Sequence, residues 1–110
     1  INSNSVRLIM ELIEIKKELE LLEHEQKSFL NYFRAKYPAY HNSNIFFRDF
    51  HYSVKQYLAL KGINTSYSHS EFISSAFSEL LIKRNILRKI DKNTMKLNYE
   101  EFITGNPVVI

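Results

Sequence analysis

The strongest constraint on this chain is an apolar repeat that runs through residues 5–36. Its apolar positions alternate spacings of four and three residues, which is the rhythm of an amphipathic helix and of a coiled-coil heptad. A continuous helix of this length would extend for about 48 Å, whereas a domain built from the rest of the chain should measure about 30 Å. Part of the helix should therefore project. The repeat places Leu12, Leu19, Gln26 and Phe33 at a positions, and Leu8, Ile15, Leu22 and Phe29 at d positions.

The apolar stripe of this helix needs a cover, and a second copy of the chain is the simplest one. We therefore expect a homodimer or a higher oligomer. Two other arrangements fit the same pattern: the helix folds back on its own domain, or it packs on another segment of a longer polypeptide or complex to which the chain belongs. The residues expected at the interface between copies are Leu8, Leu12, Ile15, Leu19, Leu22 and Phe29.

Two further helices are predicted between residues 45 and 84. Pro38 and the polar run at residues 41–44 end the first helix. The second helix is predicted over residues 45–61 and the third over residues 69–84, each with apolar side chains along one face. The chain is thus predicted to divide into a long amphipathic helix, residues 1–40, and a domain, residues 41–110.

The third helix is predicted to begin with a capping box and to expose a serine-rich face. Ser68 and Glu71 have the spacing in which a serine caps the helix and a glutamate reaches back to the capping residue. The face predicted to be buried holds Phe72, Ile73, Ala76, Phe77, Leu80 and Leu81. The face predicted to be exposed holds Ser70, Ser74, Ser75 and Ser78.

Positive charge is concentrated at residues 83–96. The whole chain has a net charge of +3, yet this segment holds six basic residues and a single acidic one, Asp91. Alternating apolar and polar residues on both sides of a polar loop at 91–94 predict a β-hairpin over residues 86–99. Cations on a hairpin can bind phosphates, but they also suit a solvated strand edge that resists aggregation. The six cations are Lys83, Arg84, Arg88, Lys89, Lys92 and Lys96.

Three helices followed by a basic hairpin resemble the winged helix-turn-helix superfamily over residues 45–99. The matching segments are FFRDFHYSVKQYLALKG, HSEFISSAFSELLIKR and ILRKIDKNTMKLNY. The aromatic-rich helix, the S-x-x-E-F helix start and the K-L-N-Y ending are also faintly similar to the C-terminal winged domains of viral and plasmid replication helicase-primases. The resemblance implies a mostly α fold with a small β-hairpin, in which a long N-terminal helix precedes a winged-helix-like domain. It also implies a third helix in the major groove and a wing along the DNA backbone.

The resemblance makes DNA the expected partner, in a replication- or transcription-associated module that oligomerises through its N-terminal helix. Before Arg84 the third helix offers serines but no Arg, Asn or Gln, so we expect backbone contacts rather than base reading. The alternative is a protein-interaction or scaffold module of a larger assembly, with no nucleic-acid binding. The expected DNA contacts are the six cations of residues 83–96, with Ser70, Ser74 and Ser78 as secondary contacts.

The composition argues against catalysis, metal binding and membrane insertion. There is no cysteine, and the four histidines lack the spacing of a metal site, so we expect no metal and no cofactor. Two glycines are too few for a loop that cradles phosphates, and we predict that the chain is not an enzyme. No apolar run reaches the ~18 residues that a membrane span requires. We expect an intracellular location, cytoplasmic or nuclear.

Overall fold

The computed structural model describes residues 3–103 and is mostly helical, with one small antiparallel sheet. The predicted fold class is confirmed, including the long helix at the N-terminus. None of the described helices is long and apolar enough to cross a membrane. The elements are α1 (Ser3–His24), α2 (Gln26–Lys36), β1 (Asn44–Phe46), α3 (Phe47–Leu60), α4 (Tyr67–Lys83), β2 (Leu87–Lys89), β3 (Thr94–Leu97) and a 3-10 turn, η1 (Glu100–Phe102).

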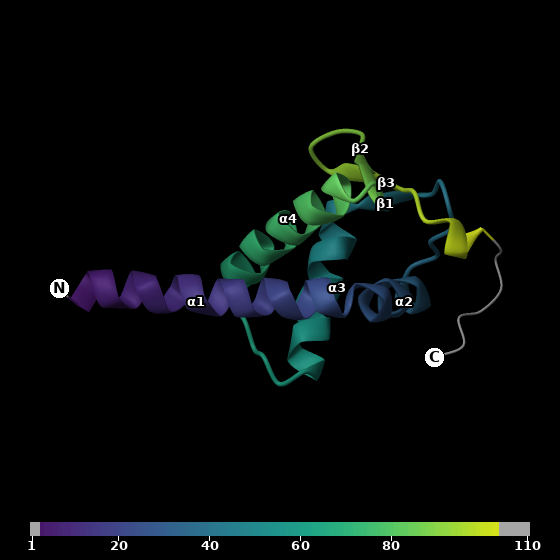
Figure 1. Ribbon diagram of the computed structural model, residues 1–110. Coiled ribbons are helices and arrows are strands. Elements are labelled where there is room, and N and C mark those ends of the chain that lie inside the picture. The colour runs from purple at the N-terminus through teal and green to yellow at the C-terminus, as the bar shows by residue number, and fades with distance from the viewer. Residues whose placement is uncertain (1–2, 104–110) are drawn as a thin grey trace.

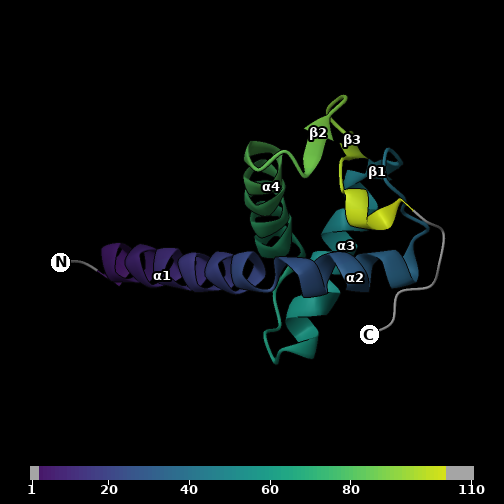
Figure 2. The ribbon, with the colours of Figure 1, turned by 45° about the vertical axis from the view of Figure 1, so that its right-hand side comes forward.

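Helices α1 and α2 follow one another along nearly the same line, and α1 projects beyond the rest of the molecule (Figures 1 and 2). The molecule measures 54 × 29 × 21 Å because of this projection. The predicted single helix is interrupted at Glu25, whose φ and ψ are −101° and 26°. Tyr57 of α3 and Lys61, the residue that follows this helix, hold Glu25 at the break: the Tyr57 hydroxyl donates to Oε1 at 2.5 Å, and Lys61 Nζ lies 2.8 Å from the same oxygen.

The core is centred on an aromatic cluster that joins α2 to α3 and α4. The ring of Phe29 is fully buried and meets those of Phe50, Tyr57 and Phe77 edge-on, at centroid distances of 5.5, 5.6 and 5.4 Å. Such edge-to-face pairs add to the stabilisation from burying the rings. Leu22 and Phe29 were predicted to face a second copy, but they are buried in the chain's own core, and that prediction is wrong.

The core also crosses the predicted boundary near residue 40. Leu30 and Phe33 belong to the same cluster of buried side chains as Ile45 and Met95, which lie in the sheet. The part of the chain before residue 40 therefore supplies core to the part after it. Residues 104–110 of the predicted second domain lie outside the described residues.

The predicted hairpin is present as β2 and β3, but a third strand pairs with it. Strand β1 comes from the segment before α3 and gives the sheet order β1-β3-β2, with both pairings antiparallel. The second helix was predicted to begin at residue 45, and it begins two residues later because residues 44–46 form β1. Asn42, with a φ of 72°, turns the chain before this strand.

Helix α4 begins earlier than predicted and buries its serines. Its N-cap is Ser66, whose Oγ accepts from the backbone N–H of His69 at 3.1 Å, instead of Ser68. Phe72, predicted to be buried, is 59% exposed. The face toward the core instead carries Ser70, Ser74 and Ser78 together with Ile73, Phe77 and Leu81.

Candidate functional site

The outer face of the three-stranded sheet brings two predicted cations together. In the register of the sheet, Lys96 on β3 lies between Arg88 on β2 and Asn44 on β1. Ile45 and Leu87, the neighbours of Asn44 and Arg88, are buried, so the row points away from the core. We call Asn44, Lys96 and Arg88 the cationic row.

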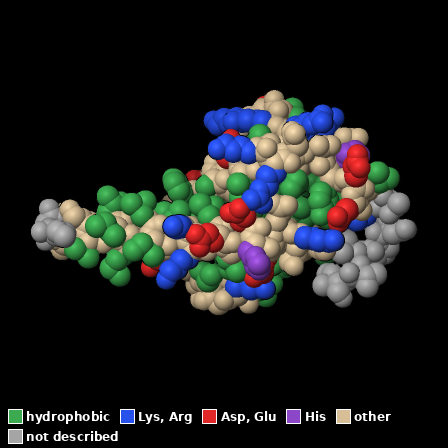
Figure 3. Space-filling model, in the orientation of Figure 1, with side chains coloured by type: hydrophobic (Ala, Val, Ile, Leu, Met, Phe, Trp, Pro, Cys, Tyr) green, Lys and Arg blue, Asp and Glu red, His purple; other side chains and the backbone are tan. Residues whose placement is uncertain are grey.

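The cationic row holds two like charges directly across from one another. Such an arrangement destabilises a sheet unless an opposite charge lies nearby. Neither Arg88 nor Lys96 makes an ion pair or a side-chain hydrogen bond with any residue from 3 to 103. Lys and Arg side chains gather over the part of the surface where Figure 1 places the sheet and the end of α4 (Figure 3). The row thus presents two cations that no carboxylate within residues 3–103 neutralises.

A second row on the same face is mostly apolar. Phe46 pairs with Thr94 in the register of the sheet and is 58% exposed. Ile90, which donates its backbone N–H to the Thr94 carbonyl at 3.0 Å, is 51% exposed. Sequence reasoning missed Asn44 and Phe46 because they belong to β1. Their only signal was the alternation of Asn44, Ile45 and Phe46, which is too short to separate from the helix that follows.

A groove of about 500 Å³ separates α4 from the hairpin. Glu71 and Glu79 line it from the exposed side of α4, while Lys89 and Lys92 line it from the hairpin, beside Asp91. The two glutamates share the exposed side of α4 with Ser75, which was predicted to be exposed. This side of α4 carries no Lys or Arg before Lys83. Apolar side chains of Phe47, Phe72, Ile82 and Met95 complete the lining.

Several predicted contact residues are committed to the fold. Arg84 donates to Gln26 Oε1 at 2.8 Å and pairs with Glu23, so it ties the end of α4 to the junction of α1 and α2. Ser70, Ser74 and Ser78 are at most 5% exposed. Their predicted exposure is wrong, and hydroxyls buried to this extent are poorly placed for the proposed contact with DNA. Lys83 remains exposed at the end of α4 and makes no ion pair within residues 3–103.

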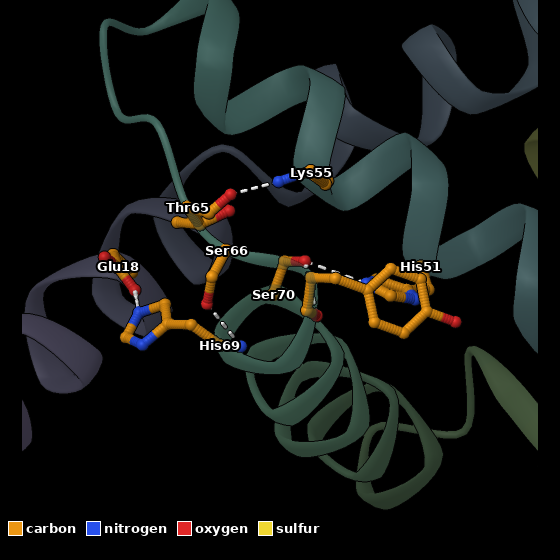
Figure 4. Close-up of polar contacts among 8 residues, drawn as sticks. Glu18, His51, Lys55, Thr65, Ser66, His69 and Ser70 are labelled. Carbon is orange, nitrogen blue, oxygen red and sulfur yellow. Dashed lines mark hydrogen bonds and ion pairs between the residues drawn. The ribbon is translucent and has the colours of Figure 1, made fainter.

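A buried histidine and serine meet where α3 packs on α4 (Figure 4). His51 Nε2 lies 2.8 Å from Ser70 Oγ, and the Ser70 hydroxyl in turn donates to the Tyr67 carbonyl at 3.0 Å. The direction of the hydrogen bond between His51 and Ser70 is set by the tautomer of the imidazole ring. Burial lowers the pKa of His51 below 6.5 and keeps the ring neutral. The pair joins α3 to α4.

A second polar contact joins α1 to α4. Glu18 is only 7% exposed, and its Oε2 lies 2.6 Å from His69 Nε2 (Figure 4). Lys55 donates to the backbone carbonyl of Thr65 in the same region. These contacts order the loop before α4. No cluster of three or more His, Asp or Glu side chains able to hold a metal ion occurs within residues 3–103.

The projecting half of α1 carries six exposed apolar side chains. Leu8 and Leu12, predicted at the interface between copies, are 56% and 57% exposed. Ile15 and Leu19, also predicted there, are half-buried against the chain's own core. Of the six residues predicted at the interface between copies, Leu8 and Leu12 are therefore the two that remain exposed. The other exposed apolar side chains of this half are Val6, Ile9, Met10 and Ile13.

Comparison of the chain with protein-family models, with curated proteins and with solved structures finds no match in any of the three. The resemblance to winged helix-turn-helix domains therefore stays a prediction. The residues from 3 to 103 themselves offer two cations on the sheet without an ion pair in that range, an exposed aromatic ring beside them, a groove with three acidic and two basic side chains, and an exposed apolar helix end.

Proposed function

We propose that this chain is a binding module, without catalytic activity, that contacts the phosphate backbone of nucleic acid through the outer face of its sheet. The cationic row is the observation that carries the proposal. Arg88 and Lys96 face each other across two strands with no carboxylate from residues 3–103 to neutralise them. A phosphate between the two side chains would relieve their repulsion and release counterions from the nucleic acid.

The order of the elements supports the proposal. Helices α2, α3 and α4 followed by the β2–β3 hairpin have the order from which the winged helix-turn-helix resemblance was argued. The acidic face of α4, with Glu71 and Glu79, argues against base reading by that helix. The proposed binding is therefore independent of sequence and strongly dependent on salt. It would place the protein in the cytoplasm or the nucleus.

A second proposed role, association with another copy of the chain, is favoured by the exposed half of α1. Leu8 and Leu12 lie one helical turn apart and are both more than half exposed. An apolar surface of this kind is typical of a contact between proteins. Two associated copies would bring two sheets to one nucleic acid and steepen the salt dependence. If the chain does not bind nucleic acid, the exposed half of α1 favours the alternative function, a protein-interaction module.

The experiment is a binding titration of the double variant Arg88→Ala with Lys96→Ala at several salt concentrations. We expect the affinity for nucleic acids of unrelated sequence to fall by about tenfold or more at low salt, and the slope of log K against log salt to fall by about 2. The matched control is Lys16→Ala with Lys17→Ala, which removes the same charge from exposed positions on α1. Equal losses in the two variants, or no loss in either, would contradict the proposal.

A further inference from the structure

Phe46 is exposed on the same face of the sheet as the cationic row. Residues Asn44, Ile45 and Phe46 alternate as exposed, buried and exposed, so the ring of Phe46 leaves the sheet on the outer side. Phe46 makes no ring stacking or cation–π contact with another residue in the range 3–103. A large ring in this position contributes little to the core.

The distance between the ring and the charges suits one nucleotide. Phe46 pairs with Thr94, which lies two residues before Lys96 on the same strand. Phe46 and Lys96 are therefore diagonal neighbours on one face, and the Cα atoms of such neighbours are about 7–8 Å apart. A phosphate held at Lys96 would leave its own base, or the next one, within reach of the Phe46 ring. Ile90 extends the apolar surface on the far side of Thr94.

We infer that the sheet binds single-stranded nucleic acid in preference to duplex, with a phosphate at Arg88 and Lys96 and an unstacked base on Phe46. The inference rests on the proposed function and names its substrate class. Every base has a π face, so an aromatic ring stacks on any base that is not already stacked. In a duplex the bases are paired and stacked, so no free base face is available to the Phe46 ring.

The width of the sheet also favours a single strand. A duplex lying on the cationic row must pass over neighbouring parts of the surface, since it is much wider than three strands. A single strand is narrow enough to follow the row alone. The face of the sheet thus selects by shape as well as by stacking.

The test uses the full chain and two labelled probes, an oligothymidine of about 15 nucleotides and a duplex of equal length, at one fixed salt concentration. We expect the single strand to bind about tenfold more tightly than the duplex. Phe46→Ala should lower the single-strand affinity by about tenfold and leave the duplex affinity unchanged. Phe46→Tyr should restore single-strand binding, because it keeps the ring.

A matched control and a direct readout accompany the affinities. Phe72→Ala removes a ring with almost the same exposure, 59% against 58%, from the acidic groove, and it should change neither affinity. Phe46→Trp introduces the chain's only tryptophan, whose fluorescence should be quenched when a base stacks on it. Circular dichroism of each variant checks that the fold is retained.

Failure of this inference can be told apart from failure of the proposed function. If the duplex binds as tightly as the single strand, or if Phe46→Ala has no effect, the preference for single strands is wrong. In that case dependence on Arg88 and Lys96 still supports phosphate binding. If neither probe binds at low salt, both are wrong. If the chain instead binds phosphatidylserine vesicles through Phe46, the ring contacts lipid and the inference is overturned.

Discussion

The first half of α1 and the whole of α2 have the same apolar repeat and opposite surroundings. Leu8 and Leu12 are 56% and 57% exposed, whereas Phe29 and Phe33 are 0% and 3% exposed. Helices α3 and α4 cover the second half of the α1–α2 line and leave the first half bare (Figure 2). The comparison teaches that a heptad pattern identifies the side of a helix that needs cover but does not identify the cover.

The largest expected difference in stability is between truncating one apolar side chain in α2 and truncating one in the first half of α1. Phe29→Ala should destabilise the folded chain by about 3–5 kcal/mol, because it leaves a cavity amid three packed rings. Leu12→Ala should change the free energy of unfolding by no more than about 0.5 kcal/mol at high dilution. Urea denaturation followed by circular dichroism measures both. Similar losses of stability in Phe29→Ala and Leu12→Ala would contradict the difference in packing between α2 and the first half of α1.

Acid should weaken the covered part of the molecule through His51. Desolvation lowers the pKa of this ring below 6.5, with the Glu71 carboxylate opposing the shift. As the pH falls through 6.5, the unfolded chain takes up a proton that the native chain does not, so stability decreases. The decrease stops once the pH is below the native pKa.

This pH dependence has a maximum slope and a control. One proton can contribute at most about 1.4 kcal/mol per pH unit. Urea midpoints measured at about pH 7.5 and about pH 5.5 give the dependence, and His51→Gln should reduce it even if the variant is less stable overall. His24→Gln, on the exposed surface of α1, is the matched control. An unchanged dependence in His51→Gln would mean that another group is responsible.

A smaller effect is expected at the junction that separates the two halves. Arg84→Ala removes the pair with Glu23 and the hydrogen bond to Gln26, which fasten α4 to the α1–α2 line. Both charged side chains are more than a third exposed, so solvent screens the pair and the loss should be at most about 1 kcal/mol. Lys83→Ala, one residue away, should have no measurable effect on the urea midpoint. A larger loss of stability in Lys83→Ala than in Arg84→Ala would show that Arg84 is not the side chain that fastens α4 to the α1–α2 line.

The smallest effect on unfolding should accompany the largest effect on association. Leu12→Glu places a charge in the middle of the exposed apolar half of α1 and should abolish self-association while leaving the dilute chain's stability nearly unchanged. Light scattering over a range of concentrations measures the mass. Lys17→Glu adds a negative charge to the same helix without removing an apolar side chain, and the chain should still associate. If the unmodified chain is a monomer at all concentrations, the α1 contact is not formed between copies.

Local sequence patterns predicted whether a segment is a helix or a strand better than they predicted which of its faces is buried. Helices α3 and α4 and the β2–β3 hairpin were predicted because their periodicity, and the residues that end them, such as Gly62, are local properties of the sequence. Strand β1 was missed because a strand of three residues is defined by its partner β3, which lies about fifty residues further along the chain. Without β1, neither Asn44 nor Phe46 could be assigned to the site.

The orientation of α4 could not be read from polarity. The polarity of serine predicts an exposed residue, but Ser70 and Ser78 satisfy their hydroxyls by donating to carbonyls three residues earlier in the helix. Such a serine is small and can be buried at little cost, so it suits a close helix contact. The hydrophobicity of Phe72 predicts a core residue, but its side chain lies exposed at the groove. Both errors moved the predicted contact surface onto the wrong face.

The unscreened pair of charges on the sheet also sets how dissolved salt should act on different ends of the molecule. Added ions shorten the range of charge interactions to about 8 Å at physiological ionic strength. At the sheet this would relax the repulsion between Arg88 and Lys96, whereas at the helix junction it would weaken the attraction of Lys61 for Glu25. Amide hydrogen exchange should consequently slow in β2 and β3 and quicken around residue 25 as sodium chloride is raised.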